Sequence, residues 1–305
     1  MRICSLLPSA TEIVFALGLE DSLVAVTHEC DYPPEAGRKA VVVKSAIDSN
    51  WPSDEIDRAV KEHSREGRSV YAIDLQALRE ADPELILTQE ICDVCAVDYD
   101  EVVRAASSLP RPPRVLSLNP HRLSDVLRDI EKVGEATGKR NEGEELARCL
   151  RTRLQQVKER ASRSDRRPRV ACLEWLDPLY SAGHWVPEMI DLAGGEDGLA
   201  HTGEPSAEIT WNRVVDFAPE IVVLMPCGFD MERTLKEIHR VRGLPGWQEI
   251  PAVREGKVFA VNGHAYFNRP GPRLVDGLEI LAQIVHPEIF PWQAPPEAAQ
   301  KIREA

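Results

Sequence analysis

The sequence predicts an α/β protein with two lobes that one long helix connects. Apolar strand-like segments alternate with amphipathic helices in both halves of the chain, which is typical of parallel sheets. A highly charged segment, residues 141–162, carries apolar side chains at helical spacing. The two halves also share one pattern, a helix followed by Asp-Pro-Glu or Ala-Pro-Glu and a buried strand, at residues 78–88 and 214–224. Repetition of this pattern favours two lobes of one type over a single long sheet.

The first lobe is expected to span residues 1–120. Ser9 and Glu12 have the spacing of a capping box, so they predict a helix start after the first strand. Gly18 is expected to end that helix. Strands are predicted at residues 3–7, 23–27, 85–88 and 115–118, with an apolar segment at 41–43, and helices at 13–19, 53–66, 75–81 and 99–107.

Residues 121–165 are expected to connect the lobes. They contain an amphipathic helix, residues 123–136, and then the long helix, residues 141–162. Apolar residues form one narrow stripe on the long helix, with spacings of 4, 4, 3 and 4: Leu146, Leu150, Leu154, Val157 and Ala161. At about 1.5 Å per residue this helix would be roughly 30 Å long, which suits a rigid connector.

The second lobe is expected to span residues 166–305 and to repeat the plan of the first. Strands are predicted at residues 170–175, 221–225 and 258–261, and helices at 185–193, 211–217, 231–242 and 272–285. The proline-rich tail from residue 287 is expected to lie on the surface. Each lobe would then be Rossmann-like with a central parallel sheet. Because ligands bind at the carboxyl edge of such sheets, we expect a ligand cleft between the lobes.

Composition excludes several classes of protein. The 305 residues are 43% hydrophobic and 29% charged, which suits folded cores, and the net charge of −13 disfavours nucleic acid and anionic membranes as partners. No apolar run approaches the ~18 residues of a membrane span. The N-terminus does not read as a signal peptide, so a cytoplasmic location is favoured, and a periplasmic or extracellular one if a leader was removed.

The seven cysteines are odd in number and scattered, which favours a reducing compartment. Cys4, Cys149 and Cys172 fall in predicted strands or on the long helix, and we expect them in the core. Cys92 and Cys95 have the two-residue gap of a metal or redox pair. With a single such pair, three interpretations stay open: a structural role, a metal contact completed by Cys30 or His28, or redox chemistry.

Reactive and aromatic residues gather in the loops after the predicted strands. A polar, thiol-bearing wall in the first lobe and an aromatic wall in the second would suit a large, partly flat ligand. Candidates in the first lobe are Pro8, Glu29, Cys30, Gln89, Cys92 and Cys95, and in the second Trp175, Tyr180, His184, Trp185, Tyr266, Phe267 and Arg269.

Two of these candidates have alternative roles. His184 could be an axial ligand to a metal, or a hydrogen-bonding loop residue. Arg269 could bind a carboxylate or phosphate of a ligand, or pair with an acidic neighbour. The usual catalytic and nucleotide-binding motifs are absent from the sequence, so we expect no enzyme and no required cofactor.

The chain resembles the vitamin B12 and ferric-siderophore binding proteins of ABC importers, and the cobalamin-binding branch most of all. The resemblance spans residues 2–286. Its segments are SLLPSATEIVFALGLEDSLVAVTHECDYPPEA, LREADPELILTQ, RVACLEWLDPLYSAGHWVPEMIDLAGGED and AVNGHAYFNRPGPRLVDGLEIL. It implies two α/β lobes joined by one long helix, with cobalamin or a related corrinoid or metal chelate held between them.

Carried over to this sequence, the resemblance implies ligand contacts in both lobes. In the first lobe these are Pro8, Glu29 and Gln89, and in the second Trp175, Tyr180, Tyr266 and Arg269. Glu29 and Gln89 stand where other members have aromatic residues.

The resemblance also implies docking on an ABC permease through a surface glutamate in each lobe. The corresponding residues here are Gln76 and Asn212, so both carboxylates are replaced. The first hypothesis is therefore a non-catalytic corrinoid-binding protein that acts as carrier, scavenger or importer substrate-binding protein. The alternative is a thiol-dependent metal-binding or redox protein using Cys92, Cys95 and Cys30.

Overall fold

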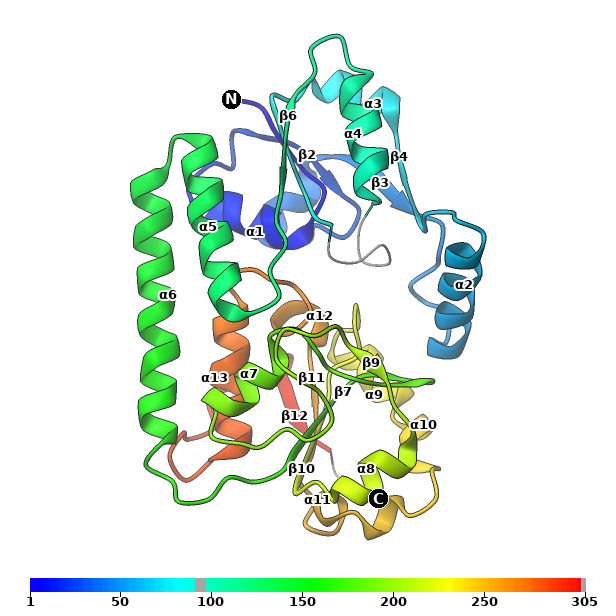
Figure 1. Cartoon of the computed structure of the whole chain (residues 1–305), viewed down its shortest axis with the longest axis vertical. Coiled ribbons are helices and arrows are strands. Elements are labelled where there is room, and N and C mark those ends of the chain that lie inside the picture. Colours follow the sequence, from blue (N-terminus) through cyan, green and yellow to red (C-terminus); the bar gives the residue numbers. More distant parts are fainter. Residues whose placement is uncertain (91–96, 303–305) are drawn as a thin grey trace. The chain divides into compact units, whose positions relative to one another are not determined.

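A computed structural model describes residues 1–90 and 97–302 of the chain. They form an α/β fold with two mixed sheets, each in its own compact unit (Figure 1). The first unit contains Met1–Trp51, Glu55–Pro120 and Ser124–Arg148, and the second Pro52–Asp54, His121–Leu123 and Cys149–Ala305. The boundary between Arg148 and Cys149 lies inside the long helix, α6 (Arg140–Ala161). The predicted α/β fold with one long connecting helix is thus confirmed.

The first sheet has the strand order β4-β3-β2-β1-β5-β6. Its strands are β1 (Ile3–Ser5), β2 (Leu23–Thr27), β3 (Ala40–Ser45), β4 (Tyr71–Ile73), β5 (Leu85–Thr88) and β6 (Arg114–Ser117). All neighbours are parallel except β4, which runs antiparallel to β3 at one edge. The carboxyl ends of five strands therefore meet at one edge of this sheet.

The helices of the first unit are α1 (Pro8–Ala16), η1 (Pro34–Arg38), α2 (Ser53–Arg65), α3 (Leu75–Ala81), α4 (Tyr99–Ser107) and α5 (Leu123–Thr137). Most of them fall close to the predicted ranges, but α1 begins earlier than predicted and η1 was not predicted. The predicted capping box at the start of α1 is wrong, because Leu7 is the N-cap and no side chain caps the helix. Pro8 at the first helical position presets the backbone dihedral, so the helix begins earlier than the Ser9–Glu12 pattern indicates. Ser9 and Glu12 are instead buried inside it.

The long helix α6 keeps most of its predicted apolar stripe. Leu150, Val157 and Ala161 are buried, and Leu146 and Leu154 are partly buried. Ala147, which lies on the same face, is fully buried as well. Cys149 is exposed, so its predicted core position is wrong, whereas Cys4 and Cys172 are buried as expected.

The second sheet has the strand order β12-β11-β10-β7-β8-β9. Its strands are β7 (Val170–Leu176), β8 (Leu179–Ser181), β9 (Ala207–Glu208), β10 (Ile221–Leu224), β11 (Val258–Val261) and β12 (Ala299–Lys301). Only β7, β10 and β11 are parallel to one another, and the outer strands are antiparallel. The tail does not simply lie on the surface, because β12 pairs with β11 and Ile302 is buried.

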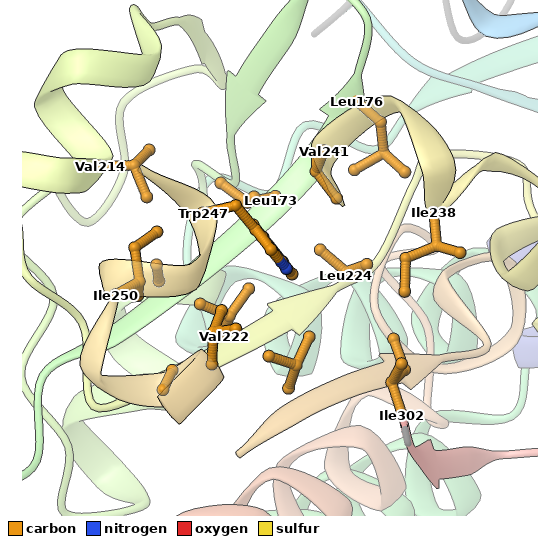
Figure 2. Close-up of a cluster of buried hydrophobic side chains, with 14 of the residues drawn as sticks. Leu173, Leu176, Val214, Val222, Leu224, Ile238, Val241, Trp247, Ile250 and Ile302 are labelled. Carbon is orange, nitrogen blue, oxygen red and sulfur yellow. The ribbon is translucent and has the colours of Figure 1, made fainter. Parts of the chain in front are cut away.

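Along the chain, the helices of the second unit lie between its strands. They are α7 (Val186–Leu192), α8 (Trp211–Phe217), α9 (Met231–Glu237), α10 (His239–Arg242), η2 (Trp247–Glu249), α11 (Pro251–Arg254), α12 (Gly263–Tyr266) and α13 (Leu274–Val285). The α13 helix packs against α7 (Figure 1). Figure 2 shows the hydrophobic core of this unit. Trp247, which is 2% exposed, lies there in one cluster with Leu173 of β7, Val222 of β10 and Val214 of α8. Within the described residues, none of the helices combines the length and the apolar character that crossing a membrane requires.

Candidate ligand-binding site

The carboxyl edge of the first sheet carries small and polar side chains. We call Pro8, Thr27, Glu29 and Tyr71, with the apolar residues beside them, the first edge. These four line one small depression with Leu6, Val43 and Val97. Pro8 comes from the start of α1, Thr27 is the last residue of β2 and Glu29 follows that strand, so the topology brings together Pro8 and Glu29, two of the predicted contact residues.

Local hydrogen bonds fix the loop after β2. The Thr27 hydroxyl accepts the Glu29 backbone N–H at 3.2 Å. The next residue, Cys30, is 3% exposed, and its sulfur accepts a hydrogen bond from the Thr11 hydroxyl at 3.1 Å. His28 lies with its ring 6.1 Å from that of Tyr71. Glu29 remains partly exposed at this edge.

Gln89 occupies a different environment from Glu29. It follows β5 directly, as predicted, but its side chain is only 7% exposed. The neighbouring Glu90 N–H is held by the Asn119 side-chain oxygen at 2.7 Å. Gln89 therefore offers a ligand little surface in this structure, whereas Pro8 and Glu29 offer more.

The carboxyl edge of the second sheet is aromatic. We call Trp175, Tyr180, Phe229 and Tyr266 the second edge. Trp175 lies near the end of β7 and pairs in register with Tyr180 of β8, and both are partly exposed. The Trp175 ring packs 5.2 Å from that of Phe229, which follows β10 and is 3% exposed.

Further contacts hold these rings in place. The Trp175 indole N–H donates to the Asp177 carbonyl at 3.1 Å. The Arg233 guanidinium lies 4.7 Å from the centre of the Phe229 ring, so that ring contacts both a cation and Trp175. Tyr266, at the end of α12, is partly exposed and has the Arg273 guanidinium 5.8 Å from its ring centre. The edge thus presents a supported aromatic surface.

His184 lies in a turn whose backbone is unusual for a residue with a side chain. Its φ of 52° is in the left-handed region, and its ring stacks on His121 at 6.0 Å and lies 5.5 Å from Trp185. Burial, and then the neighbouring His121, lowers the pKa of His184. A neutral imidazole is the form that can ligate a metal, so the axial-ligand role stays a prediction.

Three other predicted contact residues are buried and serve as supports in this structure. Trp185 is 7% exposed, and its indole N–H donates to the Phe267 carbonyl at 2.7 Å. Phe267 itself is fully buried. Arg269 is 7% exposed, and its guanidinium contacts the His264 imidazole. That contact is neither of the two roles considered for Arg269 from the sequence.

Glu174, which precedes Trp175 on β7, is a polar residue of this region that was not predicted from the sequence. Its carboxylate accepts a hydrogen bond from the Ser206 hydroxyl at 2.6 Å, and that hydroxyl accepts the Gly183 N–H at 3.0 Å. Burial raises the pKa of Glu174, and the Ser206 hydrogen bond opposes this effect. One acidic residue in the otherwise apolar strand VACLEWL was the signal that could have identified it.

The predicted metal site falls largely outside the described residues. Cys92 and Cys95 lie in the segment 91–96, which the structure does not describe. Within residues 1–90 and 97–302, His, Cys, Asp and Glu side chains form no group of three or more that could hold a metal ion. The metal contact through Cys92, Cys95 and Cys30 therefore stays a prediction.

The two positions expected to meet a permease are both on the surface. Gln76 lies in the first turn of α3, exposed, and its amide donates to the Glu80 carboxylate at 3.1 Å. Asn212 is exposed in the first turn of α8. Permease docking at these two positions stays a prediction.

Comparisons with known proteins agree with this fold. The chain is 27% identical to the uncharacterized ABC transporter substrate-binding lipoprotein YvrC of Bacillus subtilis over 296 residues, covering 95% of this chain and 81% of the relative. It is 26% identical to a vitamin B12-binding protein of Vibrio cholerae over 291 residues, covering 91% of this chain and 86% of the relative.

Solved structures show the same architecture. The periplasmic vitamin B12 binding protein BtuF of Vibrio cholerae superposes with a TM-score of 0.67 at 23% identity, covering 96% of this chain and 98% of that one. A periplasmic heme binding protein from Pseudomonas aeruginosa superposes with a TM-score of 0.74 at 19% identity, covering 100% of this chain and 99% of that one. At these identities the likeness establishes the fold.

A family model settles the class of protein. Residues 3–264 match the model described as periplasmic binding protein, and this range contains most of both sheets. The family consists of substrate-binding proteins of ABC transporters, which bind small molecules, work with permeases and are not enzymes. The expectation of a non-catalytic binding protein is thereby confirmed. The chain belongs to the periplasmic binding protein family.

Proposed function

We propose that this chain binds cobalamin or a closely related corrinoid and delivers it without chemical change. The observation that carries the proposal is the second edge, where the partly exposed Trp175 is backed by the buried Phe229. Flat, supported aromatic surface suits a macrocyclic ligand, because stacking and area burial act together there.

The first edge complements this surface chemically. Corrinoids carry amide side chains around the ring, and the partly exposed carboxylate of Glu29 can accept hydrogen bonds from amide N–H groups. Pro8 lies against the same depression as Glu29. The printed name of the Vibrio cholerae relative, a vitamin B12-binding protein, supports the same class of ligand.

A role with an ABC importer is part of the proposal. Carrier or scavenger functions would need the same binding chemistry, so binding is tested first. Relatives are named as a lipoprotein and as periplasmic proteins, and these names give no support to the cytoplasmic location that the sequence favoured. We therefore do not propose a cytoplasmic location.

The experiment is a titration of the purified protein with cyanocobalamin, aquocobalamin and hemin, followed by calorimetry and visible absorbance. We expect saturable, one-to-one binding of both cobalamins with a dissociation constant in the micromolar range or below. Absence of binding at high-micromolar cobalamin would overturn the proposal. Selective binding of hemin would replace cobalamin by an iron tetrapyrrole, a ligand class in the names of several proteins with this fold.

The two cobalamins also separate two modes of binding. Aquocobalamin has an exchangeable water on cobalt, whereas the cyanide of cyanocobalamin is held firmly. If the His184 imidazole ligates cobalt, aquocobalamin should bind more tightly and change its absorbance, and His184→Ala should remove both effects. Equal affinities without a spectral change would exclude the axial-ligand role for His184.

A further inference from the structure

A groove of about 440 Å³ lies against the part of α6 that belongs to the second unit. Its walls come from α6, from α13, which lies beside it (Figure 1), and from residues 290–293 of the tail. The residues that line it include none of the first or second edge. Its size falls within the range of small-molecule sites, which is roughly 300–1,000 Å³.

An ion-pair cluster forms part of the groove wall. Arg153 donates two hydrogen bonds to Glu279, at 2.9 and 2.7 Å, and a third to Asp276 at 2.6 Å. These partners raise the pKa of Arg153 further above its ordinary value. The positive charge of Arg153 is thus neutralised by carboxylates of this chain. Arg153 therefore lines the groove without being available to bind an anionic ligand.

Two other arginines in the groove have no such match. The Arg160 guanidinium donates to the Ile289 carbonyl at 2.8 Å and lies 4.2 Å from the centre of the Phe290 ring. The Arg163 side chain makes no hydrogen bond or ion pair with the part of the chain that the structure describes. Within residues 1–90 and 97–302, neither guanidinium has a carboxylate partner, and both residues line one groove on a chain whose net charge is −13.

The rest of the lining is mixed, and it includes the carboxylate of Glu159, which accepts a hydrogen bond from the Gln155 amide at 2.8 Å. Val157, Phe290 and Pro291 supply apolar surface, and Gln156 and Gln293 supply amides. The carbonyl that Arg160 contacts is neutral, so its guanidinium keeps donors and full charge for an anion. The Phe290 ring beneath it restricts the orientations of that guanidinium, which favours recognition of a planar or tetrahedral oxyanion.

We propose that this groove is a second binding site, for a small soluble organic anion that has a carboxylate or phosphate group on an apolar body. Arg160 and Arg163 bind the oxyanion, and Val157, Phe290 and Pro291 contact the apolar part. This site is independent of corrinoid binding at the two edges.

The probes are phenyl phosphate and benzoate, with inorganic phosphate and benzyl alcohol as partial mimics. Binding is followed by calorimetry and by NMR of the arginine side-chain N–H groups. We expect saturable binding of phenyl phosphate or benzoate, with at least about fivefold weaker binding of each partial mimic, because each lacks one half of the recognition. Binding of the two aromatic anions that is no tighter than that of benzyl alcohol would overturn the proposal.

Matched variants locate the site. Arg160→Gln and Arg163→Gln should each weaken binding about tenfold, since each removes a charge-assisted hydrogen bond. Lys158→Gln removes the same charge from the same helix at an exposed residue outside the groove, and should leave affinity within about twofold. Equal losses in all three variants would mean non-specific attraction and overturn the site. Melting curves check that the variants fold, and Trp175→Ala should not change binding of these probes.

Discussion

The two sheet edges have the same topological origin and opposite chemistry. The first edge presents Pro8, the Tyr71 ring and the Glu29 carboxylate around a small depression, and Thr27 there is buried. The second presents Trp175, Tyr180 and Tyr266, supported by Phe229. Strand ends set where ligand-binding residues lie, and the loops decide what they are. We infer that the second edge supplies most of the binding free energy and the first most of the discrimination among polar ligands.

The edges also differ in how tightly their loops are held. Gly277 of α13 lies so close to Tyr266 that a Cβ there would be 2.1 Å from the Tyr266 carbonyl oxygen. In the first unit, Gly18, Gly37, Gly67 and Gly138 have open space where a Cβ would be, and the close approaches, at Gly134 and Gly143, lie between α5 and α6, away from the first edge. The second edge is therefore built on close backbone packing, which can be broken by a single methyl group.

The largest effect is expected for Gly277→Ala. The added methyl group must displace α12 backbone, so the free energy of unfolding should fall by about 3 kcal/mol, measured by urea denaturation. Gly243→Ala is the control, because its nearest atom would be 3.7 Å away, an ordinary contact. If both variants were as stable as the native chain, the close packing of α12 on α13 would be refuted.

The next largest effect is expected for Trp175→Ala, on ligand binding. Loss of the supported ring should weaken cobalamin binding about 30-fold, or about 2 kcal/mol, measured by calorimetry. Trp175→Phe keeps an aromatic face and should lose much less. Unchanged affinity in the alanine variant would mean that the second edge does not carry the binding free energy.

Glu29→Gln tests the first edge, with a smaller expected effect. Replacing the carboxylate by an amide removes charge-assisted hydrogen bonds to ligand amides, and affinity should fall about fivefold, or ~1 kcal/mol. Glu35→Gln, at an exposed residue of the same unit, should leave affinity unchanged. A loss as large as that of Trp175→Ala would reverse the assignment of roles to the two edges.

The smallest effect is expected for Glu174→Gln, on the pH dependence of stability. Because burial raises the pKa of Glu174, the folded chain holds its proton to higher pH than the unfolded chain. Stability therefore falls as pH rises from the ordinary glutamate pKa through the raised one. The variant should melt above the native chain at neutral pH, and the difference should vanish below the ordinary pKa. Melting curves across this pH range measure the difference, with the exposed Glu249→Gln as control. A melting-temperature difference between Glu174→Gln and the native chain that did not change with pH would contradict a raised pKa of Glu174.

Much of the fold followed from periodicity in the sequence. Helices such as α3 and α8 have the predicted bounds, because their apolar residues recur at helical spacing between clear start and stop signals. The short antiparallel strands β8, β9 and β12 could not be predicted in this way. Each has only two or three residues, too few to show an alternation of apolar and polar side chains. Their pairing depends on contacts far along the chain, which local patterns do not contain.

The candidate site was predicted less completely. Position at a strand end could be read for Pro8, Glu29 and Trp175, because topology fixes which loops meet at an edge. Burial could not be read: Phe267 and Arg269 look like contact residues in sequence, yet both lie beneath other chain segments. Which loop covers another depends on packing, so the support given by Phe229 to Trp175 became visible only in three dimensions.

The position of the unit boundary within α6 bears on cooperativity. Arg140–Arg148 belong to the first unit and Cys149–Ala161 to the second. All of these residues nevertheless form one hydrogen-bonded helix. Because starting a helix is unfavourable and extending it is not, melting of either unit frays the helix that the other one uses. The two units should therefore lose structure in overlapping thermal transitions, and damage to one would be felt in the folding equilibrium of its neighbour.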